Sequence, residues 1–247
     1  MKKLIAALLL SATPAAALDL AAMNDDERGA FNDAVRAYLL DNPEVLIEAM
    51  NVLEERRIAD EAAGDARALT EFADLIFNDG HSWVGGNPEG DVTMVEFVDY
   101  RCGVCRQVYS HVFDTVEADG NIRLIIKEFP ILGEESTLAS RFAVAVLQVA
   151  GDDAYRDIHD RLFTLRGGVT EASLRALSDE AGLDTDAVIT AMNSDAVSGV
   201  LQANRQLGDR LAISGTPTFV IGDQLLRGVP RAGLVPVVEQ VRAAQDG

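Results

Sequence analysis

Cys102 and Cys105 are the only two cysteines of the 247-residue chain, and two residues stand between them. A Cys-x-x-Cys pair can serve as a redox-active dithiol, as half of a metal site or as a short structural bridge. Closing so short a loop stabilises a fold by about 2 kcal/mol, less than the roughly 3 kcal/mol of a 15-residue loop. A domain of this size gains little from such a cross-link, which favours a reactive dithiol over a structural bridge.

A zinc site would need further ligands besides the two thiolates. The chain contains three histidines, His81, His111 and His159. None of them stands at the close spacing that completes a Cys-x-x-Cys zinc site. We therefore expect no metal at the cysteines, and the sequence points to no cofactor.

The two cysteines lie where an apolar segment, residues 91–100, gives way to a helical pattern. At the N-terminus of a helix, unpaired backbone N–H groups and the positive end of the helix dipole favour a thiolate at Cys102. Cys105 follows one turn later on the inward face, where it can attack a mixed disulfide formed by Cys102. The spacing thus predicts an exposed attacking thiol and a shielded resolving thiol.

Glu96 stands in the middle of the apolar segment, six residues before Cys102. A carboxylate in such a place costs several kcal/mol if it is ionised and unpaired. We interpret Glu96 as a buried proton acceptor for Cys105, with its pKa raised by desolvation. Alternatively, Glu96 forms an ion pair with Lys127 on the neighbouring strand, and both interpretations can hold because the lysine would tune the acid.

A third motif, Thr216-Pro217, opens a strand-like segment that is otherwise unsuited to proline. A cis bond between these two residues would give a tight and rigid turn. Cis bonds are found at only about 5–6% of X-Pro positions in folded proteins, so the sequence alone leaves the isomer open.

The pattern of elements predicts an α/β fold. Buried strands over residues 91–100 and 121–129 flank the helix that follows Cys102, which is a βαβ unit with a parallel pair. Every periodic segment from about 134 to 212 is helical, which indicates an inserted helical subdomain. Two short strands at 218–221 and 224–227, joined by a Gly222-Asp223 hairpin turn, and a closing helix complete the order βαβ, helical insert, ββα.

The N-terminus has the pattern of a secretory signal peptide. Two lysines precede an apolar run over residues 4–10 and the small residues Ala15 to Ala17, so we expect residues 1–17 to be cleaved. The apolar run is shorter than the roughly 20 residues of a membrane span. The mature protein is therefore expected to be exported.

Residues 18–63 form a helical arm in two pieces, interrupted at Asp41-Asn42-Pro43. Its apolar stripe either packs on its own domain or pairs with copies of itself as a coiled-coil-like oligomerisation arm. Gly64 stands in a polar stretch that could act as a hinge, followed by a helix and connector over residues 64–90. The turn-rich run from Gly85 to Gly90 places the start of the main domain at residue 91, and this domain extends to 247.

The strong negative charge of the mature chain argues against polyanionic partners. Cleavage removes Lys2 and Lys3 and leaves 19 basic residues against 40 acidic ones. Such a surface repels nucleic acid and anionic membrane faces.

From Asp91 onwards, the chain resembles the DsbA-like branch of the thioredoxin superfamily. The resemblance rests on the stretch from Glu96 to Cys105, on the helical insert and on residues 215–220. It implies a thioredoxin fold in which Cys102 is the nucleophile, Cys105 resolves and Glu96 is a buried proton shuttle. It also implies that Pro217 is cis and faces the dithiol, with Thr216 contacting the substrate backbone.

The arm, over residues 30–50, resembles the leading segment of ScsC and Com1-type relatives. In some of these proteins the segment mediates trimerisation and the oligomer acts as a disulfide isomerase. The resemblance therefore implies a periplasmic thiol–disulfide oxidoreductase that acts on unfolded or misbridged exported proteins, with a membrane redox partner and a homo-oligomer formed through the arm. The alternative is a periplasmic copper-handling protein, because two soft thiolates suit Cu(I).

This sequence departs from the strongest oxidases, which carry Pro-His between their cysteines. Gly103-Val104 offers neither a charge nor a ring donor to the thiolate. We therefore expect a less depressed Cys102 pKa and a less oxidising couple, which favours isomerase or reductase activity.

Overall fold

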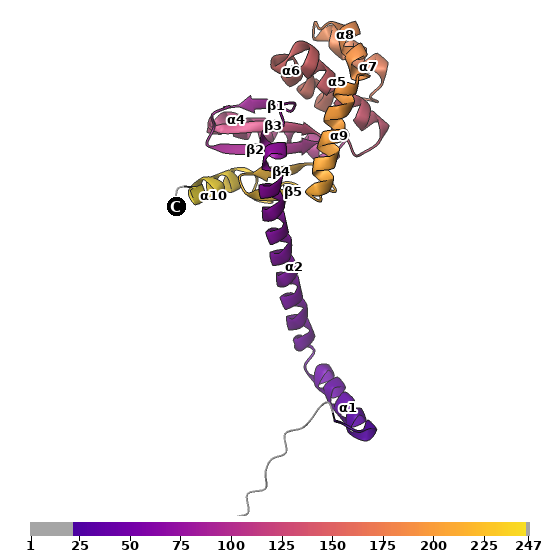
Figure 1. The fold of residues 1–247 in the computed structure, drawn as a ribbon, viewed down its shortest axis with the longest axis vertical. Coiled ribbons are helices and arrows are strands. Elements are labelled where there is room, and N and C mark those ends of the chain that lie inside the picture. Colours follow the sequence, from indigo (N-terminus) through magenta and orange to yellow (C-terminus); the bar gives the residue numbers. More distant parts are fainter. Residues whose placement is uncertain (1–21, 246–247) are drawn as a thin grey trace, which may run out of the picture. The chain divides into compact units, whose positions relative to one another are not determined.

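The computed structural model describes residues 22–245 (Figure 1). The predicted signal peptide, residues 1–17, and the first four residues of the predicted arm lie outside the described residues. The chain divides into two compact units, with the boundary between Ala59 and Asp60. No helix in the described range is long and apolar enough to cross a membrane.

The first unit consists of α1 (Asp25–Asp41) and the first part of α2 (Glu44–Glu71). Asn24 begins α1 with a capping box, since its side chain accepts from the Glu27 N–H at 3.0 Å while the Glu27 carboxylate accepts from the Asn24 N–H at 3.0 Å. The interruption predicted at Asn42-Pro43 is present. Gly64, at which a hinge was predicted, lies inside α2. One helical glycine costs about 1 kcal/mol relative to alanine, which a helix of 28 residues tolerates.

The arm helices lack a core of their own. Within the described residues, α1 has no buried side chain, and the one buried residue of α2 is Leu69, which belongs to the second unit. Helices in proteins gain most of their stability from packing an apolar face against other elements. The large apolar side chains of the arm helices are nevertheless exposed, among them Tyr38, Leu40, Leu46, Ile47, Met50 and Leu53.

The second unit is built on a five-stranded sheet in the order β1-β3-β2-β4-β5. β2 and β3 are parallel, and the other neighbouring pairs are antiparallel. This arrangement confirms the predicted α/β class and the βαβ…ββα order. The strands are β1 (Trp83–Gly86), β2 (Val92–Val98), β3 (Ile122–Glu128), β4 (Thr218–Ile221) and β5 (Gln224–Arg227).

The edge strand β1 was not predicted, because its glycines indicated a turn. Gly85 and Gly86 instead belong to a strand that allows very close packing. A Cβ on Gly85 would lie 2.0 Å from the Trp83 ring, and one on Gly86 would lie 2.4 Å from the Ile122 carbonyl oxygen. Gly86 also has φ +68°, a conformation that favours glycine.

Helices cover both faces of the sheet. One face packs against α4 (Gly103–Asp119), α10 (Val235–Gln245) and the insert, and the other packs against the end of α2, α3 (Ala73–Phe77) and residues of α9. The insert consists of five helices, as predicted (Figure 1). They are α5 (Glu134–Ala150), α6 (Asp152–Thr164), α7 (Glu171–Glu180), α8 (Thr185–Met192) and α9 (Asp195–Arg210).

Candidate active site

Cys102 is the N-cap residue of α4. Its backbone is extended, with φ −71° and ψ 121°, and its sulfur accepts a hydrogen bond from the Cys105 N–H at 3.5 Å. A sulfur in this position faces the unpaired donors and the positive end of the helix dipole. Cys102 is only 8% exposed, so it is less open than the sequence suggested, and it is still the more accessible of the two thiols.

Cys105 lies one turn further along α4 and is completely buried. Its side chain belongs to the core cluster between the sheet and α4. Both cysteines are free thiols in this structure.

The two thiols have opposite acidities. Burial by itself raises the pKa of Cys102, but contacts with Thr216 and with backbone N–H groups at the start of α4 outweigh it and leave this pKa below its ordinary value. Burial, together with the charges of Glu96 and Cys102, strongly raises the pKa of Cys105. A proton therefore leaves Cys102 far more easily than Cys105. This difference suits Cys102 to attack a substrate disulfide and Cys105 to remain protonated until the mixed disulfide has formed.

Glu96 lies on β2, on the same face of the sheet as the buried cysteines. It is 1% exposed, and its Oε1 atom has no hydrogen-bond partner among the described residues. Burial, and to a lesser extent the charge of Cys102, raises the pKa of Glu96 to about 8. An acid with this pKa exchanges protons readily near neutral pH.

The ion pair considered between Glu96 and Lys127 is wrong. In the parallel β2–β3 register, Glu96 is opposite Ile126 and Lys127 is opposite Phe97, so the two side chains point to different faces. Lys127 forms a buried ion pair with Asp79 and donates to the Leu75 carbonyl at 3.0 Å. Burial alone would raise the pKa of Asp79, but the ammonium lowers it to about 2.

The Thr216-Pro217 peptide bond is cis, as the resemblance implied. This loop packs directly against the dithiol, since the Cys102 thiol donates to the Thr216 carbonyl oxygen at 3.1 Å. The Thr216 hydroxyl is buried and has no hydrogen-bond partner within the described part of the chain. The structure thus brings all five predicted site residues, Glu96, Cys102, Cys105, Thr216 and Pro217, into one region.

Asp99, which the sequence analysis did not single out, fixes the turn that leads to Cys102. It is fully buried, and its carboxylate accepts from three backbone N–H groups, those of Arg101 at 2.8 Å, Ile131 at 2.8 Å and Leu132 at 3.0 Å. Its own carbonyl oxygen accepts from the Cys102 N–H at 3.0 Å. The sequence does contain one indication of this role, because Asp99 is a charged residue at the end of a segment predicted to be a buried strand.

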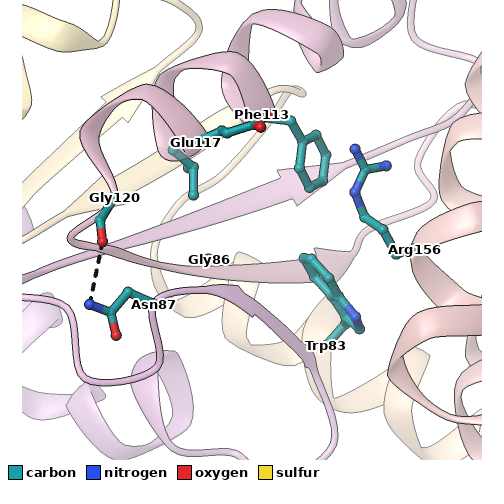
Figure 2. Close-up of a pocket in the computed structure, with 8 residues that line it drawn as sticks. Trp83, Gly86, Asn87, Phe113, Glu117, Gly120 and Arg156 are labelled. Carbon is teal, nitrogen blue, oxygen red and sulfur yellow. Dashed lines mark hydrogen bonds between the residues drawn. The ribbon is translucent and has the colours of Figure 1, made fainter.

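The cavity in Figure 2 lies away from this site. It has a volume of about 450 Å³ and is lined mainly by Trp83, Phe113, Glu117 and Arg156. Phe113 is eleven residues along α4 from Cys102, which is about 16 Å of helix. None of the predicted site residues lines this cavity. Within residues 22–245, no group of three or more His, Cys, Asp or Glu residues is arranged to hold a metal ion.

Two protein families match this chain, one over the arm and one over the second unit. Residues 78–232 match the family described as Thioredoxin, and residues 27–59 match the family described as Copper resistance protein ScsC N-terminal domain. A thioredoxin-like oxidoreductase from Silicibacter pomeroyi is 37% identical, with 70% of this chain and 98% of that chain covered and a TM-score of 0.64. Proteus mirabilis ScsC is 29% identical, with 92% and 100% covered and a TM-score of 0.65. The thiol-disulfide exchange protein alpha-DsbA2 from Wolbachia pipientis is 26% identical, with 75% and 98% covered and a TM-score of 0.68.

Curated relatives match part of the chain. Disulfide bond formation protein D of Bacillus subtilis is 23% identical over 152 residues, which is 58% of this chain and 68% of that protein. The Na(+)/H(+) antiporter NhaA 3 of Salinispora tropica is 26% identical over 145 residues, which is 59% of this chain. The match spans only 22% of the antiporter's length.

A thioredoxin fold with a Cys-x-x-Cys pair at a helix N-terminus and a cis-proline against it defines a class of thiol–disulfide exchange proteins. The chain has the fold and the site geometry of this class. It belongs to the thioredoxin superfamily, in the DsbA-like branch and close to ScsC.

Proposed function

We propose that this protein is an exported oxidoreductase that forms or isomerises disulfides in periplasmic proteins through its Cys-Gly-Val-Cys dithiol. The observation that carries this proposal is the contrast between the two thiols. Cys102 has a lowered pKa at the N-terminus of α4, and Cys105 has a raised pKa in the core behind it.

In the proposed reaction, the Cys102 thiolate attacks a substrate disulfide, forms a mixed disulfide and releases one substrate thiolate. For reduction, Cys105 loses its proton and attacks the Cys102 sulfur, so that the dithiol gives up two electrons and the second substrate thiolate leaves. Isomerisation ends instead when a substrate thiolate displaces Cys102. Oxidation of a substrate dithiol is the reverse of the reduction.

Glu96 is proposed to accept the Cys105 proton during resolution. In the mixed disulfide Cys102 carries no charge, so its contribution to the raised pKa values of Glu96 and Cys105 disappears. Both groups then release protons more easily than in the reduced protein. A buried carboxylate beside the resolving thiol is suited to general base catalysis.

Thr216 and Pro217 are proposed to bind the substrate backbone. The loop lies against Cys102, and the Thr216 hydroxyl is a buried polar group whose hydrogen-bonding capacity is unused among the described residues. A substrate peptide beside the attacking sulfur can supply a partner. Backbone contacts of this kind suit unfolded or misbridged proteins because they carry no sequence preference.

The proposed domain organisation assigns residues 1–17 to a signal peptide, 18–63 to the arm, 64–90 to a connector and 91–247 to the catalytic domain. Export would place the protein in the periplasm, where disulfides form. Turnover there needs a membrane redox partner to restore the dithiol or the disulfide.

The arm is proposed to form a homo-oligomer, with a trimer as the expected state. Its exposed apolar side chains, including Leu46, Met50 and Leu53, need a partner that excludes water. Substituting Leu46→Asp and Leu53→Asp together in the full mature chain should convert the oligomer into a monomer in sizing experiments. A monomer in the wild-type protein would contradict the proposal.

Isomerase activity is the direction that we favour, because the side chains of Gly103 and Val104 provide neither a charge nor a ring donor that would stabilise the Cys102 thiolate further. The resting redox state in cells tests this. A reduced Cys102–Cys105 pair supports an isomerase, and a fully oxidised pair supports an oxidase recharged by a quinone-linked partner.

Copper handling is the second candidate, favoured by the ScsC-like arm and by the pair of soft thiols. Insulin reduction and Cu(I) affinity should be measured for the wild type and for Cys102→Ala. Wild-type insulin reduction by this variant would overturn the redox proposal. Unchanged Cu(I) affinity would overturn the copper proposal.

A further inference from the structure

A second buried carboxylate, that of Glu128, lies on the same face of the sheet as Glu96. Glu128 ends β3 and is 3% exposed. Three hydroxyl groups donate to it, with the Tyr100 and Tyr155 hydroxyls at 2.7 and 2.6 Å from Oε1 and the Ser140 hydroxyl at 2.7 Å from Oε2. Three donors on one buried acid satisfy most of its accepting capacity.

Tyr100 has a further partner in His159 of α6. The distance between the Tyr100 hydroxyl oxygen and Nδ1 of His159 is 2.9 Å. Because the hydroxyl proton is donated to Glu128, Nδ1 must carry a proton and donate to Tyr100. Burial, with the nearby charge of Arg156, lowers the pKa of His159 to about 3, so the ring is neutral. Both hydrogen-bonding functions of the Tyr100 hydroxyl are therefore occupied.

Two residues that line the cavity in Figure 2, Trp83 and Phe113, pack against the residues around Glu128. Trp83 stacks on Tyr155 with ring centroids 5.5 Å apart, and Phe113 contacts His159 edge-to-face at 5.6 Å. The Arg156 guanidinium lies over the Phe113 ring, 3.6 Å from its centroid. In such a dry environment hydrogen bonds are stronger than in water, and breaking one leaves an unsatisfied buried group.

The members of the cluster differ in one respect that matters for the dithiol. Tyr155 and Ser140 are on helices of the insert, whereas Tyr100 is on the turn between β2 and α4, two residues before Cys102. The backbone N–H of Cys102 donates to Asp99 within this same turn. The Tyr100 side chain thus fixes the turn to β3 and to the insert, as Asp99 fixes it to residues 131 and 132.

We propose that Tyr100 and Glu128 are positioning residues for Cys102: the buried hydrogen bond between them holds the turn that places the attacking sulfur at the N-terminus of α4 and against Thr216. Without this bond the turn gains freedom. Cys102 then spends less time in contact with the donors that stabilise its thiolate. The proposal rests on the proposed thiol–disulfide exchange function and gives Tyr100 and Glu128 a role that the family resemblance did not assign to them.

The test compares two variants that each delete one phenolic hydroxyl from the same carboxylate oxygen. Tyr100→Phe and Tyr155→Phe both keep the aromatic ring and its packing, and both remove a hydrogen bond of nearly the same length. Tyr100→Phe should lower the urea midpoint more than Tyr155→Phe, because it also removes the contact between the Tyr100 hydroxyl and His159. Only Tyr100→Phe removes the link to the turn, so a purely structural role predicts equal effects on the dithiol, and a positioning role predicts unequal ones.

Two quantities are measured on the full mature protein: the Cys102 thiolate titration at 240 nm, and the equilibrium constant of Cys102–Cys105 with glutathione. For Tyr100→Phe we expect the thiolate fraction at neutral pH and the equilibrium constant for reduction each to fall about threefold. A threefold change corresponds to about 14 mV for a two-electron couple. Tyr155→Phe and Ser140→Ala should leave both quantities unchanged. Equal shifts in the two tyrosine variants, or no shift in either, would overturn the proposal.

Glu128→Gln provides a second comparison, because its amide oxygen can still accept from Tyr100 while its charge is gone. Its effect on the dithiol should be smaller than that of Tyr100→Phe. A larger fall in the thiolate fraction than Tyr100→Phe gives would overturn the positioning role of the Tyr100–Glu128 hydrogen bond, and a rise would show that the Glu128 charge acts on the thiolate instead. A wild-type dithiol that does not exchange with glutathione would refute the proposed function itself, which separates the two failures.

Discussion

Replacing Glu96 by glutamine removes a buried titratable carboxyl group while keeping the shape of the side chain. Burial, with a smaller contribution from Cys102, raises the pKa of this carboxyl from 4.5 to about 8. Between pH 5 and 6.5 the folded state keeps this proton, and the unfolded chain has already released it. The folded state therefore binds more protons, and its stability falls as the pH rises.

The magnitude follows from counting protons over this window. Each group with such a shift contributes about 1.4 kcal/mol per pH unit. Glu128, with a pKa raised to about 7 mainly by burial, acts in the same direction as Glu96. His159 acts oppositely, because its pKa falls from 6.5 to about 3 on burial and the unfolded chain binds the extra proton. The wild type should thus lose about 2 kcal/mol between pH 5 and 6.5, whereas Glu96→Gln should lose almost none.

Urea unfolding of the reduced protein, followed by the fluorescence of the only tryptophan, Trp83, measures this difference. Because Trp83 belongs to the second unit, the signal reports on the domain that contains the site. Glu89→Gln removes an exposed carboxyl group and should keep the wild-type slope. Parallel pH slopes for the wild type and Glu96→Gln would show that Glu96 is ionised in the folded state and would refute its assignment as a high-pKa acid.

Three further predictions concern the dithiol and the packing of the sheet. Cys105→Ser should trap the mixed disulfide between Cys102 and a substrate thiol, seen as a mass increase in intact-protein mass spectrometry, and rapid release would contradict the resolving role. Lys127→Met should lower the free energy of unfolding by about 3–5 kcal/mol because it removes the ammonium that pairs with the buried Asp79 carboxylate, and adding Asp79→Asn should recover part of this loss in the same urea assay. Gly86→Ala should cost about 1–3 kcal/mol in thermal unfolding because its Cβ would meet the Ile122 carbonyl, and a neutral effect would contradict the observed β1 geometry.

The sequence determined the order of the elements other than β1 and the placement of the two cysteines at a helix start. Both depend on short-range patterns: apolar periodicity separates strands from helices, and a two-residue spacing places Cys102 and Cys105 one turn apart at a helix start. The helical insert followed from the same periodicity. The edge strand β1 could not be predicted, because Gly85 and Gly86 locally indicate a turn. Only the approach of the Trp83 ring and the Ile122 carbonyl explains why glycine is required at these two positions.

The tertiary structure decided which polar groups meet. Sequence spacing made Lys127 a plausible partner for Glu96, but the strand register sends the two side chains to opposite faces and leaves the lysine with Asp79. The contact between Tyr100 and Glu128 joins residues 28 positions apart through the same register. Side chains alternate between the faces of a sheet, so a shift of one residue exchanges every partner. Hydrogen-bond partners across strands therefore depend on packing that no local pattern encodes.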